Sequence, residues 1–124
     1  FLAASRRAGK EQYLVRYFIS SHPGSTSDHA LKLLEYLIKK NLHLEQVQDF
    51  TPVPLTLSTA MYVSGCDKTG KKIFVPKGHS DKKLQLALLQ YNRPENQRML
   101  INFLSSKGRK DLIAKLKTHL RRHR

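Results

Sequence analysis

Apolar residues form two contrasting patterns in the first half of the chain, and each predicts a different element. In residues 12–20 the apolar side chains are nearly continuous, interrupted mainly by Arg16, as is typical of a parallel strand covered on both faces. Residues 25–40 open with Ser and Thr, which can cap a helix, and then carry apolar side chains at helical spacing. Residues 44–50 predict a second strand, ended by a Pro-rich turn. We therefore predict a parallel strand–helix–strand unit with a right-handed crossover.

The rest of the chain is predicted to be mainly helical. Residues 55–63 fit either a short helix or an extended segment, and residues 71–75 fit a short β segment. Helices are predicted at the start of the chain, ended by Gly9, and over residues 81–91, 94–107 and 109–122. The expected fold class is α/β, with one parallel βαβ unit packed with C-terminal helices.

The whole chain has a net charge of +14, and the positive charge is concentrated in its second half. Residues 1–67 carry seven Lys/Arg and six Asp/Glu, whereas residues 68–124 carry sixteen and three. Such a step suggests a near-neutral folded part joined to a basic part that binds a polyanion, with RNA the usual candidate. A solvated surface, or one covered by acidic residues of a longer protein, explains the charge equally well.

The candidate RNA-binding residues are the basic side chains around the last predicted helix. They are Lys107, Arg109, Lys110, Lys115, Lys117, Arg121 and Arg122. His119 and His123 lie four residues apart in the same region, which is a metal-ligand spacing. The neighbouring arginines disfavour a bound cation, so an ordinary solvated helix face is the preferred interpretation.

Few motifs of known catalytic chemistry are present. The sequence has no phosphate-binding P-loop, no nucleophile elbow and no His-Glu-x-x-His motif. Its one cysteine, Cys66, excludes an internal disulfide and any cysteine-rich metal site made by this chain alone. The absence of cysteine pairs fits a reducing, cytoplasmic compartment. No apolar run approaches the roughly 18 residues of a membrane span, so no membrane interaction is expected.

The turn after the first predicted strand holds the candidate ligand-binding residues. His22 and Gly24 follow the carboxyl end of that strand, where β/α proteins bind their ligands. Alternatively, His22 only hydrogen-bonds the turn, and Gly24 only supplies a positive φ or allows close packing. Gln48 and Asp49 end the second predicted strand and point to opposite faces, so at most one of them faces a barrel interior.

Six short segments of the chain occur in the same order in a known family. They are Tyr17-Phe-Ile-Ser-Ser-His-Pro-Gly24, Gln46-Val-Gln-Asp-Phe-Thr-Pro-Val-Pro54, Met61-Tyr-Val-Ser-Gly65, Phe74-Val-Pro-Lys77, Ala87-Leu-Leu-Gln-Tyr91 and Arg93-Pro-Glu-Asn96. Over about residues 10–113 the chain resembles the YgiQ-type radical SAM proteins. Arg16 departs from the family, whose members often carry proline there, and the basic tail from about Ala114 no longer follows the pattern.

The resemblance implies the C-terminal portion of a radical SAM oxidoreductase. Such enzymes are partial (β/α)₆ barrels that hold a [4Fe–4S] cluster on three cysteines near the first strand and use S-adenosylmethionine as a source of radicals. Residues 1–66 would be the late part of the barrel, with 12–20 as the fifth strand and 46–50 as the sixth. Residues 67–124 would form a basic, mainly helical extension.

The same resemblance assigns the site residues and the partners. Ile19, Ser21, His22 and Gly24 would contact the adenosyl part of S-adenosylmethionine. One cysteine cannot hold a [4Fe–4S] cluster, so the chain alone is expected to be catalytically silent and to bind no cofactor by itself. Its expected role is to close the barrel formed by the N-terminal remainder of the parent protein.

Overall fold

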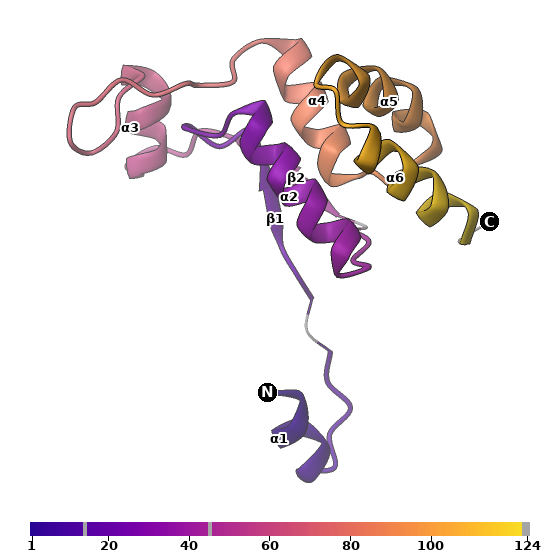
Figure 1. Ribbon diagram of the computed structural model, residues 1–124. Coiled ribbons are helices and arrows are strands. Elements are labelled where there is room, and N and C mark those ends of the chain that lie inside the picture. The colour runs from indigo at the N-terminus through magenta and orange to yellow at the C-terminus, as the bar shows by residue number, and fades with distance from the viewer. Residues whose placement is uncertain (14, 45, 123–124) are drawn as a thin grey trace.

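The computed structural model describes residues 1–13, 15–44 and 46–122, and their side chains through Thr118. Figure 1 shows a short two-stranded sheet beside a group of helices, with one helix at the N-terminus and another in the middle of the chain standing apart. The elements in chain order are α1 (Leu2–Arg7), β1 (Phe18–Ser20), α2 (Ser27–Lys39), β2 (Val47–Asp49), α3 (Leu57–Ser64), α4 (His79–Leu89), the 3₁₀ helix η1 (Pro94–Asn96), α5 (Gln97–Ser106) and α6 (Lys110–Arg122).

The strands β1 and β2 are parallel and are joined through α2, which confirms the predicted strand–helix–strand order and the mixed α/β class. In the register of the sheet, Ile19 lies opposite Gln48. Thr26 caps α2 because its side chain accepts the backbone N–H of His29 at 3.3 Å. The capping residue is thus one of the Ser/Thr residues at positions 25–27, and the third of them, Ser27, is the first residue of the helix.

Both strands are shorter than predicted, and the predicted burial of residues 12–20 on both faces is wrong. The side chains of Tyr13, Val15 and Tyr17 are 64–87% exposed. Phe18 and Val47 pack against the helical core, whereas Ile19 and Gln48, on the opposite face, are exposed. A continuous apolar run requires cover on both faces, but the described helices cover only one face of these two strands.

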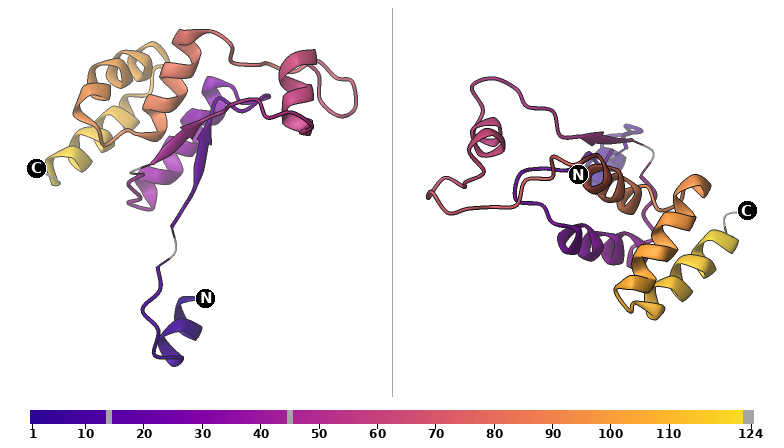
Figure 2. Two further views of the ribbon diagram at one scale, coloured as in Figure 1. Left: turned by 180° about the vertical axis from the view of Figure 1, so that it is seen from behind. Right: turned by 90° about the horizontal axis from the view of Figure 1, so that it is seen from above.

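In the middle of the chain, the structure decides whether residues 55–63 are helical or extended, and it corrects the predicted β segment over residues 71–75. Residues 57–64 are helical, and the Thr56 side chain caps α3 by accepting the N–H of Thr59 at 3.2 Å. No residue of α3 is buried, and Figure 2 shows the helix at the end of an arm, away from the other helices. Residues 71–75 do not form a strand; the segment makes a single antiparallel bridge, between Cys66 and Lys72.

The core is formed by α2, α4, α5 and α6, which lie side by side in all views (Figures 1 and 2). Apolar side chains at helical spacing face this core, and the most deeply buried of them include Leu34, Leu37, Leu88, Leu100, Leu104 and Leu116. The phenol of Tyr91 is also buried and donates to the carbonyl of Leu42 at 3.1 Å. Burial raises the pKa of Tyr91 to about 12.

The helix boundaries differ from the predicted ones at single turns. The predicted helix over 81–91 begins earlier, at His79, and the one over 94–107 is divided into η1 and α5. α5 ends before Gly108, whose φ of +69° is the left-handed conformation that glycine adopts most easily. Packing of α2 against α4 joins residues on both sides of position 66, and the proposed division into two regions there stays a prediction.

Candidate functional site

Ser21 lies at the carboxyl end of β1 in an unusual state. Its backbone φ is +61°, a left-handed conformation that non-glycine residues rarely adopt. The residue is fully buried, and its hydroxyl has no hydrogen-bond partner of ordinary geometry among the described residues. Strained backbone and unpartnered buried hydroxyls both cost free energy, and they cluster at functional sites.

The loop after β1 is held by the side chain of Gln85 from α4. Its oxygen accepts the backbone N–H of Ser21 at 3.2 Å, and its nitrogen donates to the carbonyl of Ser25 at 2.8 Å. Sequence reasoning missed Gln85, although a signal was present. Gln85 is a polar residue on the same helical stripe as Leu88 and Leu89, and polar residues on a buried stripe need a partner.

His22 connects the end of β1 to α3. Its Nδ1 lies 2.9 Å from the carbonyl oxygen of Pro23, and its Nε2 lies 2.9 Å from the hydroxyl of Ser58. Because a carbonyl can only accept, we assign the proton to Nδ1, which leaves Nε2 to accept from Ser58. His22 thus bonds its own turn, as one interpretation expected, and also contacts a distant helix.

An aromatic row extends from His22 away from the strands. The ring of Phe50, which follows β2, meets the His22 ring edge-on, with centroids 5.3 Å apart. Tyr62 of α3 lies next, 5.7 Å from Phe50, and Lys77 Nζ lies 5.1 Å from the Tyr62 ring centroid. These contacts attach the α3 arm to the carboxyl ends of both strands.

Gly24 has the positive φ that the sequence predicted, at +89°. Its N–H donates to the carbonyl of Phe74 at 2.7 Å, which ties the loop to the segment that precedes α4. No atom lies within 4 Å of the position that a Cβ would take. Backbone conformation, and not close packing, is therefore the reason for glycine here.

Asp49 and Gln48 point to opposite faces of β2, as predicted. Asp49 accepts from the Ser20 hydroxyl at 2.9 Å and lies 3.4 Å from Lys82 Nζ. Partial burial acts to raise the pKa of Asp49, but the hydroxyls of Ser21 and Ser20 and the charge of Lys82 outweigh it, so the pKa is lowered. Asp49 is thus part of a polar network on the helix side, and Gln48 is the one that faces away from the helices, together with Ile19.

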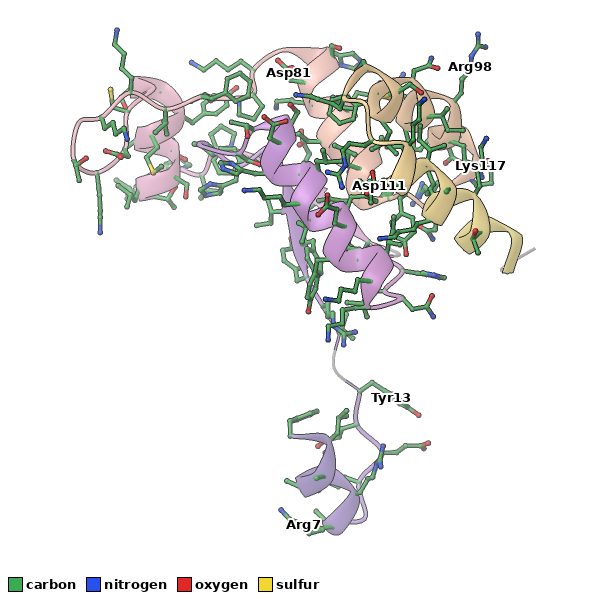
Figure 3. The ribbon with its side chains drawn as sticks, in the orientation of Figure 1. Arg7, Tyr13, Asp81, Arg98, Asp111 and Lys117 are labelled. Carbon is green, nitrogen blue, oxygen red and sulfur yellow. The ribbon has the colours of Figure 1, made fainter. Side chains whose placement is uncertain are left out.

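Two of the basic candidates around α6 form ion pairs within the chain. Lys107 forms an ion pair with Asp28 at 2.9 Å, and Arg109 forms ion pairs with Glu35 of α2 and Asp111. The bidentate contact with Arg109 lowers the pKa of Asp111 to about 2. Asp111 lies between α2 and α6, whereas Lys117 extends from the outer side of the helices (Figure 3).

The other basic candidates are not paired in this way. Lys110, Lys115 and Lys117 are exposed. The side chains of Arg121 and Arg122, and the proposed histidine pair, lie outside the described side chains.

Metal ligands and membrane helices were sought within the described residues. Those residues contain no group of three His, Cys, Asp or Glu side chains placed to bind a metal ion together. Cys66 is a free, half-buried thiol. Over the same residues, no helix has the length and apolar character needed to cross a membrane.

The chain matches one family model and is similar in sequence to several known proteins. Residues 45–123 match the family model described as "Domain of unknown function (DUF3362)". A UPF0313 protein of Methanocella arvoryzae is 48% identical over 110 residues, which cover 88% of this chain and 18% of the relative. The UPF0313 protein of Methanosarcina acetivorans is 45% identical over 91% of this chain and 15% of its own length. The UPF0313 protein YgiQ of Escherichia coli is 44% identical over 88% of this chain and 16% of its own length.

The length of these matches limits what they describe. The chain spans less than a fifth of the curated relatives it matches. No solved structure matches it. Nearly the whole chain is nevertheless aligned to each relative, and the motifs that suggested a YgiQ-type protein lie within these matches. The chain belongs to the DUF3362 domain family and is homologous to the UPF0313 proteins, YgiQ among them.

Proposed function

We propose that the chain is the C-terminal portion of a YgiQ-type radical SAM iron–sulfur oxidoreductase, in which residues 19–24 and 48–51 line the S-adenosylmethionine site. The observation that carries the proposal is Ser21. It combines strained backbone with a fully buried hydroxyl beside Asp49 at the carboxyl end of a parallel strand. Such strand ends are where β/α proteins bind ligands, and the position is the one at which radical SAM proteins of this type resemble the chain.

The residues on the open face of the sheet fit the adenosyl part of the cofactor. Ile19 is 46% exposed and offers apolar surface for a base, on the face opposite the helices. Ser21 follows Ile19 in the chain, and its left-handed backbone begins the loop that leaves this edge of the sheet. Gln48 lies opposite Ile19 and adds an amide to the same face.

The other residues of the loop position these groups. Gln85 fixes the backbone at both Ser21 and Ser25 from a helix of the core, and Gly24 permits the turn between them. Ser58 orients the His22 ring from the α3 arm. A site held in this way on core elements would be preorganised, which lowers the entropic cost of binding.

This chain by itself lacks the ligands for a [4Fe–4S] cluster. A cubane cluster requires three or four ligands, and Cys66 is the one cysteine of the sequence. Its ligands would therefore come from the remainder of the parent protein. When bound there, the cluster and S-adenosylmethionine would supply radical chemistry on a substrate.

The test measures S-adenosylmethionine binding to the full-length protein by calorimetry. Ile19→Arg would put a charged side chain against the adenosyl group and should weaken binding at least about tenfold, equivalent to 1.4 kcal/mol. Leu55→Arg is the matched control, because Leu55 is fully exposed on the α3 arm. Cluster absorbance should be the same in both variants. Equal affinity of the two variants for the cofactor would contradict the assignment of the open face.

A further inference from the structure

The helix α6 has a basic side that its packing leaves free. Leu112 and Leu116 are 2% and 0% exposed and face the core. Lys110, Lys115 and Lys117 are exposed. A helix rises about 1.5 Å per residue, so Lys110 and Lys117 lie about 10.5 Å apart along its axis, two turns from one another.

A groove of about 1050 Å³ lies between α6 and α2. Ile38 of α2 and Leu112 and Ala114 of α6 give it apolar surface. Lys39 and Asn41 line it at the C-terminal end of α2, and Lys115 and Thr118 line it from α6. The sequence had indicated only basic residues around the last helix; the fold adds Lys39 and Asn41, which lie 69 or more positions before Lys110.

The acidic side chains near this groove are already paired. Glu35 and Asp111 line the groove itself, and both pair with Arg109, which lines it too. Asp28 pairs with Lys107. The ion-pair distances place no carboxylate of the described residues beside Lys39, Lys110, Lys115 or Lys117. These four ammonium groups therefore remain available to a partner, whereas Lys107 and Arg109 hold the fold together.

We propose that the groove lined by Lys39, Asn41 and Lys115, together with the outer face of α6 that carries Lys110 and Lys117, binds the sugar–phosphate backbone of RNA. Exposed lysines on both sides of a groove favour a polymer of closely spaced phosphates over a single small anion, because each neutralised phosphate releases counterions. The amide of Asn41 both donates and accepts hydrogen bonds, as a ribose 2′-hydroxyl requires, and this group distinguishes RNA from DNA.

A membrane surface fits the same features less well. A helix that lies on a membrane inserts an apolar face, but Leu112, Ile113 and Leu116 of α6 pack into the core. The RNA surface is also separate from the proposed cofactor site, because none of its residues belongs to the loop or strands that form that site. The inference stands or falls independently of the radical SAM proposal.

The test compares two triple variants of the full chain that carry the same net charge. Lys110→Glu, Lys115→Glu and Lys117→Glu together reverse the basic side of α6. Lys68→Glu, Lys71→Glu and Lys72→Glu together reverse three exposed lysines of the loop after α3, as the matched control. Circular dichroism of both variants should match that of the unmodified chain, since none of the six side chains is buried.

Binding is measured by fluorescence anisotropy with a labelled RNA stem-loop of about 20 nucleotides, at about 50 and 200 mM salt. The α6 variant should bind at least about tenfold more weakly than the loop variant, with a salt slope reduced by about 2, as expected for three lost phosphate contacts. Equal losses in the two variants would show that diffuse net charge, and not this surface, attracts the RNA.

Two further probes separate RNA from other polyanions. A DNA stem-loop of the same sequence should bind more weakly than the RNA, and Asn41→Ala should reduce that difference. Equal affinity for RNA and DNA would overturn the assignment to RNA. Vesicles containing phosphatidylserine should sediment little of the chain; capture by vesicles that exceeds RNA binding would assign the surface to membranes instead.

Discussion

The side-chain oxygen of Gln85 accepts the backbone N–H of Ser21 at 3.2 Å, although 64 residues separate the two in the chain. Gln85 is 2% exposed and belongs to a helix that packs against α2 in the core. The same amide bonds Ser25, so one side chain fixes both ends of the loop after β1. The geometry of the candidate site therefore depends on core packing as well as on the loop's own residues.

Gln85→Leu should destabilise the chain by about 1–3 kcal/mol, because it leaves the buried N–H of Ser21 and the carbonyl of Ser25 without their partner. Urea denaturation followed by circular dichroism measures the change. Gln48→Leu is the control, since Gln48 is exposed on the open face of the sheet, and it should change stability by less than about 0.5 kcal/mol. Equal effects of the two substitutions would show that the Gln85 contacts contribute nothing.

Two threonine caps should differ in their effect on stability. Thr26→Ala removes the cap of α2, a core helix, and should cost about 1 kcal/mol of global stability. Thr56→Ala removes an equivalent cap from α3, which buries no residue, so fraying of α3 should leave the urea midpoint unchanged. Amide hydrogen exchange should then quicken only within residues 57–64. A loss of global stability in Thr56→Ala would show that α3 belongs to the cooperative core.

Local patterns predicted the helices of the core well, because the spacing of the apolar residues in each helix shows which face is buried. Leu34 and Leu37 mark the buried face of α2, and Leu112 and Leu116 mark that of α6. The strands were predicted in the right place and order but too long. A continuous apolar run such as residues 12–20 predicts a strand that other elements cover on both faces. The described helices cover these two strands on one face only.

The candidate site could be predicted only in part, since its contacts are not local. The turn after the first strand indicated His22 and Gly24, the family resemblance added Ser21, and a positive φ was one of the two reasons expected for Gly24. The contacts of Ser21 with Gln85 and of His22 with Ser58 span 64 and 36 positions, and no spacing rule encodes such pairs. Lys39 joins the α6 lysines for the same reason.

Stability should fall at low pH partly through Asp49. Its pKa is below the usual value of 3.8 in the folded state, so its contribution to stability is present above about pH 3.8 and is lost as the pH falls through the lower, folded-state pKa. The difference in unfolding free energy between the unmodified chain and Asp49→Asn should therefore shrink between about pH 6 and about pH 2. Urea denaturation at both pH values measures it.

A second substitution tests the cause of that pKa shift. Ser20→Ala removes the hydroxyl that donates to Asp49 at 2.9 Å, and the carboxyl should then titrate at higher pH than in the unmodified chain. NMR titration of the Asp49 side chain detects this change directly. An unchanged titration in Ser20→Ala would mean that Lys82 and Ser21 alone account for the low pKa.

Shortening a buried side chain of the core should destabilise the protein, whereas shortening an exposed side chain of α3 should not. Leu34 is 0% exposed, and Leu34→Ala should cost about 2–5 kcal/mol through lost burial and the cavity left behind. Val63 of α3 is 71% exposed, and Val63→Ala should change stability by less than about 0.5 kcal/mol. Thermal unfolding of both variants provides the comparison; a large cost at Val63 would place α3 within the packed core.

The exposed alternation before β1 has a consequence for handling the protein. Tyr13, Val15 and Tyr17 precede β1 and Ile19 lies in it, and all four side chains are at least 46% exposed. Such an edge is a template for intermolecular strand pairing, the first step toward aggregates. Arg16 interrupts it with a charge and acts as a gatekeeper against that pairing. Replacing Arg16 with an apolar residue would remove this protection, so the arginine contributes to solubility even though it packs against nothing buried.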